Sequence, residues 1–229
     1  MTKYRLKYCK ESGMRFISHL DLLKMFSRAA RRCRLPLSYS QGFNPHPELV
    51  FNAPLPLGVT SEAEYVDLSL DEELPEAECL SRLASALPEG IRPLSVRKLD
   101  SKEATVMKYV CACQYRLTVC VQGVAPNDFV AEIQKKLALE EPILIMKKSK
   151  SGIKETDIRP LIRAFFENTE IQDTLLTFTC ITAAGNIMNL RPEVALTGLS
   201  QVVFGDSVAL DIQGIHKIRY YTEDGGTPD

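Results

Sequence analysis

The chain lacks the sequence motifs of several large enzyme classes. It has no G-x-G-x-x-G and no Walker motif, so neither common nucleotide-binding loop is present. It has no G-x-S-x-G nucleophile elbow and no H-E-x-x-H zinc motif. These absences exclude the enzyme classes that those motifs define, and the sequence names no reaction by itself.

Cysteine spacing also excludes common metal centres. The chain has seven cysteines, an odd number scattered through apparent core segments, which favours reduced thiols of a cytosolic protein. Cys111 and Cys113 form the only close pair, and no C-x-x-C partner follows them. The C-x-x-x-C-x-x-C run that ligates an iron–sulfur cluster is missing too. We therefore expect no metal and no cofactor.

Long apolar runs are absent as well. No stretch approaches the length of a membrane span, and the first ten residues (MTKYRLKYCK) contain no apolar signal-peptide segment. We therefore expect a cytoplasmic protein without a membrane partner. The 45% hydrophobic and 25% charged residues are typical of an ordinary globular chain. A length of 229 residues predicts one or two domains.

Positive charge is concentrated near the start of the chain. Residues 1–50 hold ten Lys and Arg against three Asp and Glu, whereas residues 51–100 hold four against ten. The net charge is only −1, but binding depends on the local patch more than on the sum. A basic surface is therefore expected in the first fifty residues.

A helix is predicted over residues 18–34. Ser18 followed by Asp21 forms an S-x-x-D start signal, and Pro36 ends the helix. Apolar residues recur at helical spacing and predict the buried face: Leu22, Phe26, Ala29 and Cys33. Cations occupy much of the remaining surface, which is either a solvated face matched to the helix dipole or an anion-binding face.

The segment SYSQGFNPHP follows this helix and predicts a rigid loop, because its Gly, Asn and Pro residues disfavour helix and central strand. Planar side chains and amides beside a basic helix are typical of single-stranded nucleic-acid sites. The alternative is a loop whose aromatic side chains fold back into the core. The RNA-binding candidates from helix and loop are Arg28, Arg31, Arg32, Gln41, Phe43, Asn44 and His46.

A catalytic alternative uses the same region. His19 at the helix start and His46 in the loop could act as general acid and base in metal-independent RNA cleavage, with Tyr39 as a third group. A helix N-terminus disfavours protonated histidine, so a neutral hydrogen-bonding role suits His19 better.

A second basic segment lies at KKSKSGIKETDIRP, and its predicted turn spans residues 147–154. A basic hairpin tip is a common phosphate contact and equally a normal solvated loop. The candidates for phosphate binding there are Lys150, Lys154 and Arg159.

Hydrophobic periodicity predicts an α+β fold of two tandem ferredoxin-like (βαββαβ) domains. The first spans residues 1–100 and contains the basic helix and the Pro-rich loop. The polar stretch DSKEATVMK precedes the second domain, which spans residues 109–222. Residues 223–229 form a polar, Gly-containing tail that is predicted to be disordered.

Five segments of the chain resemble a known family. The segments are RFISHLDLLKMFSRAARR, LPLSYSQGFNPHP, PLPLGVTSEAEYVDL, KETDIRPLI and LRPEVALTGL. They closely resemble the radical-SAM-linked protein family, a bacterial domain of unknown function. It occurs beside or fused to B12-binding-type radical S-adenosylmethionine (radical SAM) proteins. The resemblance implies a radical SAM protein as partner and implies no reaction.

The leading hypothesis from the sequence is an accessory protein, not an enzyme on its own. It would bind RNA (tRNA or rRNA) or a related substrate and present it to a radical SAM enzyme. One alternative is a metal-independent ribonuclease or RNA-modifying enzyme using His19 and His46. The other is a protein–protein adaptor whose basic helix docks an acidic partner.

Overall fold

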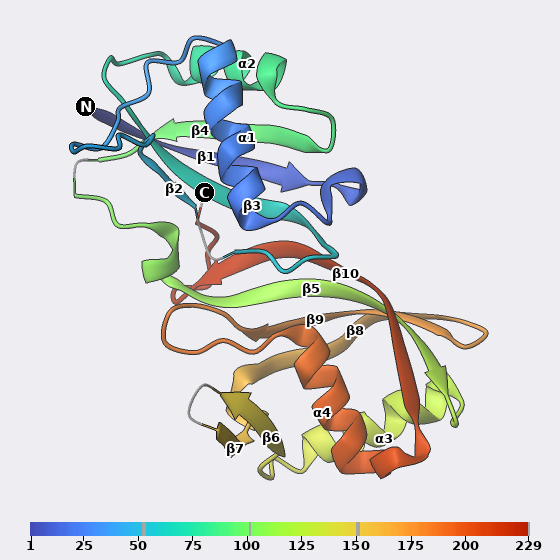
Figure 1. The fold of residues 1–229 in the computed structure, drawn as a ribbon. Coiled ribbons are helices and arrows are strands. Elements are labelled where there is room, and N and C mark those ends of the chain that lie inside the picture. The colour runs from blue at the N-terminus through green and yellow to red at the C-terminus, as the bar shows by residue number, and fades with distance from the viewer. Residues whose placement is uncertain (52–53, 101, 150–151, 229) are drawn as a thin grey trace. The chain divides into compact units, whose positions relative to one another are not determined.

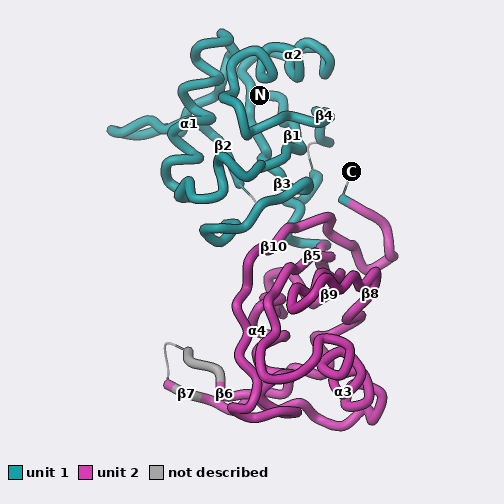
Figure 2. The backbone as a smooth tube through the Cα atoms, turned by 90° about the vertical axis from the view of Figure 1, so that its right-hand side faces the viewer, with its two compact units in different colours: residues 1–109, 228–229 teal, residues 110–227 magenta. Residues whose placement is uncertain are grey.

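The computed structural model describes residues 1–51, 54–100, 102–149 and 152–228. The chain divides into two compact units (Figure 2). Unit 1 comprises residues 1–109 with 228–229, and unit 2 comprises residues 110–227. Helices and antiparallel strands in both units make this an α+β protein, with four α-helices in the described ranges.

Unit 1 contains four strands and two helices (Figure 1). Its sheet has the strand order β4-β1-β3-β2, and every neighbouring pair in it is antiparallel. In chain order the elements are β1 (Thr2–Lys10), α1 (His19–Arg32), β2 (Leu49–Phe51), β3 (Val59–Leu70), α2 (Glu76–Ala86) and β4 (Ile91–Lys98).

Helix α1 begins and ends where local chemistry predicts. The Ser18 hydroxyl accepts a hydrogen bond from the Asp21 amide at 3.2 Å, which satisfies one of the free donors of the first turn. At the other end Arg34 has φ +55°, and the Leu35 amide donates to the Ala30 carbonyl at 2.9 Å. The predicted interior residues Leu22, Phe26 and Ala29 are buried, as is Ala30, whereas Cys33 is only half-buried. Cys33 lies outside the last helical turn, so the buried stripe ends before it.

The core of unit 1 lies between the sheet and its two helices. Aromatic contacts connect the helix layer to the sheet. The ring centroid of Phe26 in α1 lies 5.0 Å from that of Tyr8 in β1 and 5.3 Å from that of Phe51 in β2. The other buried members come from β1, β3, β4, both helices and the loop after α1: Tyr4, Leu6, Leu22, Ala30, Leu35, Leu37, Val66, Leu68, Leu70, Cys79, Leu83, Ile91 and Val96.

An ion-pair network lies on the other face of this sheet. Arg5 donates to both carboxylate oxygens of Asp67 at 2.7 and 2.9 Å and to Glu103 at 3.2 Å, and it also bonds the Tyr109 hydroxyl. Burial lowers the pKa of Arg5, but the bonds and charge of Asp67 outweigh it and leave that pKa raised. The hydrogen bond from Arg97 is the main cause that lowers the pKa of Glu103. The network fastens residues 103–109 to strands β1 and β3.

Unit 2 has a four-stranded antiparallel sheet of order β10-β5-β9-β8 and a separate hairpin of β6 with β7. Its core includes Phe129 of α3, Phe178 of β9 and Leu199 of α4. In chain order the elements are β5 (Val110–Gln122), α3 (Pro126–Ala138), β6 (Leu144–Ser149), β7 (Gly152–Asp157), β8 (Ile162–Gln172), β9 (Leu175–Ala183), α4 (Pro192–Phe204) and β10 (Ala209–Thr222).

Three features of unit 2 differ from what the local sequence pattern predicts. The apolar run at residues 142–146 predicts a short strand and residues 147–154 a turn, whereas the structure has the longer hairpin β6–β7 there. Residues 157–166 read as extended, but a short 3₁₀ turn, Arg159–Leu161, interrupts them, because Pro160 has no amide hydrogen for a sheet. Residues 208–212 and 215–221 read as two strands, whereas the structure has one strand, β10, with a register shift between Ile212 and Gly214.

In the described part of the chain, no helix is long and apolar enough to cross a membrane. All seven cysteines are free thiols.

Candidate functional site

The inner face of strand β1 ends in a buried charge. Side chains that alternate along the strand lie on one face of a sheet. Tyr4, Leu6 and Tyr8 line the face below α1 and are at most 1% exposed. Lys10 continues the same alternation and is 2% exposed. A lysine therefore occupies the end of a face that is otherwise apolar.

Strand β3 repeats this arrangement beside it. Val66, Leu68 and Leu70 alternate on the buried face, and Glu64 precedes them with 3% exposure. Glu64 lies directly opposite Tyr8 in the antiparallel register. Both central strands therefore bring one charged side chain to the same end of the inner face.

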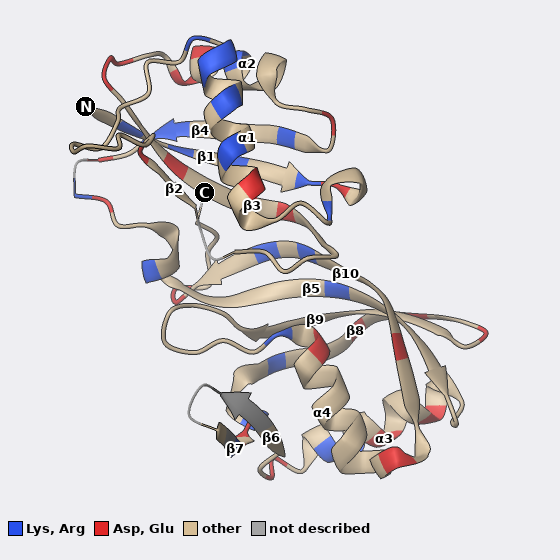
Figure 3. Ribbon diagram, in the orientation of Figure 1, with Lys and Arg blue, Asp and Glu red and all other residues tan. Residues whose placement is uncertain are grey.

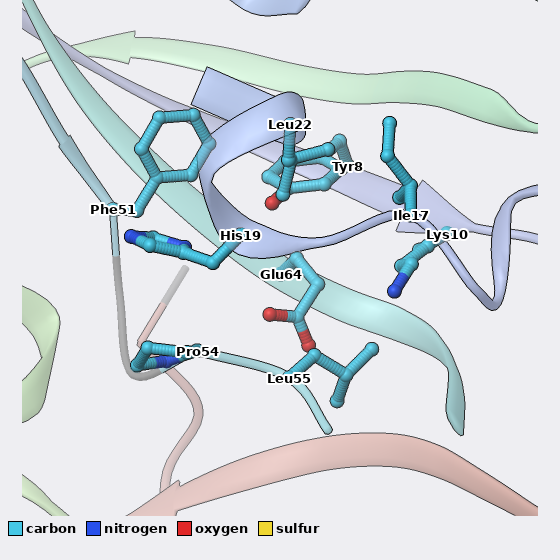
Figure 4. Close-up of a pocket in the computed structure, with 9 residues that line it drawn as sticks. All are labelled: Tyr8, Lys10, Ile17, His19, Leu22, Phe51, Pro54, Leu55 and Glu64. Atoms are coloured by element: carbon cyan, nitrogen blue, oxygen red, sulfur yellow. The ribbon is translucent and has the colours of Figure 1, made fainter. Parts of the chain in front are cut away.

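Helix α1 begins above this end of the sheet, and a small recess lies there (Figure 4). The cavity is about 10 Å³, which is room for about one water molecule. The His19 ring lies edge-on to Phe51 with ring centroids 5.6 Å apart, which orients the imidazole at the recess. The lining residues are Tyr8, Lys10, Ile17, His19, Leu22, Phe51, Pro54, Leu55 and Glu64.

Donors and acceptors meet in the recess. Lys10 Nζ donates to the Arg15 carbonyl at 3.3 Å, and Lys10 and Glu64 each make further interactions inside the fold. In the view of Figure 4 the Glu64 carboxylate lies between the His19 ring and the Lys10 ammonium. A cation, an anion and an imidazole on one water-sized space can hydrogen-bond a polar group or assist a proton transfer.

Exposed apolar side chains adjoin the recess in sequence. Phe16, Leu20 and Leu57 are 68%, 68% and 63% exposed. The Arg15 guanidinium lies 4.9 Å from the Phe16 ring centroid, and the Arg15 carbonyl accepts hydrogen bonds from Lys10 and from the Gly58 amide. An exposed aromatic ring is thus tied to the segment that bonds the buried lysine.

The C-terminal half of α1 carries the basic face. Figure 3 shows Lys and Arg spaced along α1 towards its C-terminal end. Arg28 and Arg31 are both exposed, and Arg31 Nε donates to the Tyr39 hydroxyl at 3.0 Å. The same guanidinium lies 5.7 Å from the Tyr39 ring centroid. This contact joins the helix to the loop that follows it.

Hydrogen bonds within the loop after the helix stabilise its base. The Ser40 amide donates to the His46 carbonyl at 2.9 Å, and Ser40 Oγ lies 2.8 Å from His46 Nδ1. These bonds close the base of the loop and leave its tip in solvent. Gln41 and Asn44 are exposed, and Phe43 is fully exposed at 106%. The candidate aromatic Phe43 therefore does not fold back into the core.

Arg32 points to a different neighbour. Its guanidinium donates to the carbonyl of Ala86 at the end of α2. Arg82 of α2 donates in return to the Arg34 carbonyl at 3.0 Å. Arg32 thus contributes to helix packing, although its exposed side chain still adds positive charge to this end of α1.

The structure does not bring the three catalytic candidates together. Tyr39 contacts Arg31, and Tyr39 pairs with Pro47 next to His46, so these two candidates share the C-terminal end of α1. His19 is twelve residues before Arg31, which corresponds to about 18 Å along a helix. His19 shares its surroundings with Lys10 and Glu64 instead.

The candidates of the second basic segment belong to unit 2. Lys154 lies on β7 and is exposed, whereas Lys150 lies outside the described residues. The Arg159 guanidinium donates to the Leu137 carbonyl at 2.9 Å and is partly buried. Arg159 therefore caps the end of α3. Of the three candidates Lys150, Lys154 and Arg159, Lys154 is the one that the described residues show as an exposed cation.

Lys10 and Glu64 line the recess, and the sequence analysis did not single them out. A charged residue in a strand is ordinarily expected to face solvent. The signal was nevertheless present, because Lys10 continues the alternation of Tyr4, Leu6 and Tyr8, and Glu64 that of Val66 and Leu68. A charged residue that the strand alternation places on the buried face is either a paired core group or part of a functional site.

The described residues contain no cluster of side chains that would bind a metal ion. Among those residues no group of three or more His, Cys, Asp or Glu side chains could hold an ion. The recess contains one carboxylate and one imidazole, together with a competing ammonium.

Comparison with known sequences identifies the family. Residues 3–192 match the model of a family described as "Uncharacterized protein conserved in bacteria (DUF2344)", and the chain belongs to that family. A search of curated proteins found no match.

Solved structures also align with this chain, and two of them are described next. A chain in the crystal structure of a Cbf5-Nop10-Gar1 complex aligns with a TM-score of 0.53 and 11% identity, over 96% of this chain and 50% of that chain. This chain therefore spans half the length of the protein it matches, and the likeness concerns the fold alone. An unknown protein from Galdieria sulphuraria aligns over 92% of this chain and 96% of its own, with 16% identity and a TM-score of 0.25.

Proposed function

We propose that this protein is an RNA-binding accessory protein that presents its substrate to a radical SAM enzyme. The observation that carries the RNA part is the exposed pair Arg28 and Arg31 on α1, with Arg31 held against Tyr39 of the neighbouring loop. Guanidinium groups beside an exposed aromatic loop suit a single-stranded RNA, which offers phosphates and unstacked bases.

The charges on α1 are available for an anion. Lys24 lies 3.8 Å from Asp21 in an exposed pair, which is a weak interaction. Among the described residues Arg28 has no hydrogen bond or ion-pair partner. An exposed, unneutralised guanidinium can bind phosphate through two parallel hydrogen bonds.

The radical SAM partner rests on the resemblance of RFISHLDLLKMFSRAARR and LPLSYSQGFNPHP to the radical-SAM-linked family. Seven free thiols favour a reducing compartment, so we place this work in the cytoplasm. We also propose that each unit is ferredoxin-like. In support, β1, β2, β3 and β4 follow the sheet order 4-1-3-2, and β5, β8, β9 and β10 repeat it.

A salt series tests the RNA proposal. Wild type and the variant Arg28→Ala with Arg31→Ala are titrated with labelled single-stranded RNA by filter binding. The control variant, Lys3→Ala with Lys102→Ala, removes the same charge from exposed positions elsewhere in unit 1. We expect steeply salt-dependent binding, with a log–log slope that the α1 variant flattens by about one unit and the control leaves unchanged.

Other outcomes select the alternatives. Absent or salt-independent binding would remove the RNA proposal and leave a protein–protein adaptor. A cleavage assay in EDTA, run beside the binding series, tests the nuclease alternative. Metal-independent cleavage that is lost in His46→Ala or His19→Ala would make the protein an enzyme.

A further inference from the structure

We propose that the groove between strand β6 and helix α4 of unit 2 binds an extended peptide segment of a partner protein. The segment adds to β6 as a third strand and places a basic side chain at Glu193. This inference goes beyond the RNA function, which rests on residues of unit 1. It concerns a second contact, with protein instead of nucleic acid.

The groove is open and has the size of a binding cleft. Its volume is about 460 Å³, and ligand clefts in proteins measure about 300–1,000 Å³. One wall is formed by three successive residues of β6, which are Leu144, Ile145 and Met146. The other wall is one stripe of α4 from Glu193 to Val202. Figure 1 shows the hairpin β6–β7 beside this helix.

The outer edge of β6 carries backbone groups that do not pair with β7. Among the described residues β6 pairs with β7 alone. The Ile158 amide donates to the Ile143 carbonyl at 2.9 Å, and hydrogen-bonded pairs alternate along an antiparallel ladder. Ile145 therefore bonds to β7, whereas the N–H and C=O groups of Leu144 and Met146 point away from it. Such an edge is a template for a further strand.

Helix α4 offers a surface for the side chains of that strand. Ile145 lies so close to α4 that a Cβ atom on Gly198 would be 2.7 Å from its Cγ2 atom, so the glycine allows this approach. Three apolar residues border the groove and stay exposed: Leu144 at 47%, Met146 at 68% and Val202 at 40%. Exposed apolar side chains around a cleft are typical of a protein interaction site. Alternate side chains of an added strand would cover them.

The charge of the groove favours a basic occupant. Glu193 is the charged residue in its lining. Glu193 and Arg191 form an ion pair at 3.3 Å with side chains 26% and 60% exposed, which is a weak surface pair. The carboxylate can accept further hydrogen bonds, it repels phosphate and it attracts lysine or arginine. An extended segment with one basic residue and alternating apolar residues therefore matches the edge, the lining and the charge.

The first experiment titrates the full chain with a labelled peptide, acetyl-Lys-Val-Thr-Val-Thr-amide, by fluorescence anisotropy. Alternate amides of a strand face the same edge, so two N-methylated versions are made, one for each alternate set. We expect saturable binding that methylation of one set weakens by at least about tenfold, while the other set is the control. Hydrogen exchange at the Leu144 and Met146 amides should slow in the complex. Equal binding of all three peptides would overturn strand addition and make the groove a site for apolar ligands.

Protein variants locate the peptide. Val202→Lys puts a charge into the groove at an exposed position and should abolish binding, with an unchanged circular dichroism spectrum. Ile171→Lys makes the same change at a 37% exposed position of β8 and should bind as wild type does. Glu193→Gln should weaken the lysine peptide by about threefold and leave a norleucine version unchanged. Equal losses for both peptides would refute the charge contact.

Two results would overturn the groove as a peptide site. One is the absence of saturable binding by wild type up to about 1 mM peptide. The other is full binding by the folded Val202→Lys variant. RNA titration of the same variant keeps the two proposals distinguishable, because the arginines of α1 are unaltered and RNA affinity should match wild type.

Discussion

Arg31 of α1 and Tyr39 of the following loop make a two-part contact: a 3.0 Å hydrogen bond to the hydroxyl and a guanidinium 5.7 Å from the ring centroid. The contact fixes the direction of a long side chain that would otherwise sample many rotamers in solvent. A ligand that meets Arg31 therefore costs less side-chain entropy than one that must order a free arginine. It also joins the helix to the base of the loop.

Phe43 at the tip of that loop gives the first prediction. Its ring is fully exposed, so Phe43→Ala should leave the melting temperature within about 1 °C, because surface changes cost little. If the ring stacks on a base, RNA affinity should fall by about tenfold. Val50→Ala, which shortens another exposed apolar side chain, is the control for nonspecific loss. Unchanged affinity in the Phe43 variant would assign the loop to another role.

The second prediction concerns acid stability. The bond from Arg97 holds the pKa of Glu103 below its ordinary value of 4.5 in the folded state. A carboxylate with a depressed pKa stabilises the fold above its unfolded pKa, and this contribution is lost as the pH falls through the folded pKa. Urea unfolding should therefore show that Glu103→Gln destabilises the protein at pH 7 and has little effect in strong acid. The exposed Glu72→Gln should give no such pH-dependent difference.

The third prediction concerns the start of α1. Ser18 accepts the Asp21 amide hydrogen bond, so Ser18→Ala should lower the free energy of unfolding by about 1 kcal/mol. Ser18→Asn keeps an acceptor at the same position and should lose much less. Both values come from urea unfolding followed by circular dichroism. An equal loss in both variants would mean that the hydroxyl acts through another contact.

The fourth prediction concerns thiol chemistry. Burial raises the pKa of the Cys79 thiol to about 11, so little of it is thiolate near neutral pH. Iodoacetamide at pH 8 should alkylate the half-buried Cys111 and Cys120 well before Cys79, as read by peptide mass spectrometry. Denaturant should abolish the difference. Fast labelling of Cys79 in the native protein would show that α2 opens readily.

The sequence predicted α1 well because its capping and its buried stripe depend on neighbouring residues. The Ser18 cap and the Leu22, Phe26 and Ala29 stripe depend only on residues within the helix, and all appear in the structure. The hairpin β6–β7 was shortened in the prediction because the basic residues after Met146 do not alternate with apolar ones. Its pairing comes from the partner strand, which a local pattern does not contain.

The recess was not predicted for a different reason. Lys10 and Glu64 are 54 positions apart, and only the β1–β3 register brings them to one end of the sheet. A lone lysine or glutamate in a strand normally faces solvent. Their common burial can be recognised only when both strands are paired and the alternation of their apolar neighbours is compared.

The alternation that puts Tyr8 and Lys10 of β1 on one buried face has a consequence for how this chain can change length. Deleting Cys9 would move Lys10 by one position and turn its side chain to the opposite face of the sheet. Every residue would remain chemically the same, yet the ammonium would leave the recess. Substitutions in this segment can be gradual, whereas such a deletion removes the ammonium from the recess in one step. Relatives that keep the recess should therefore hold constant the spacing between Tyr8 and Lys10.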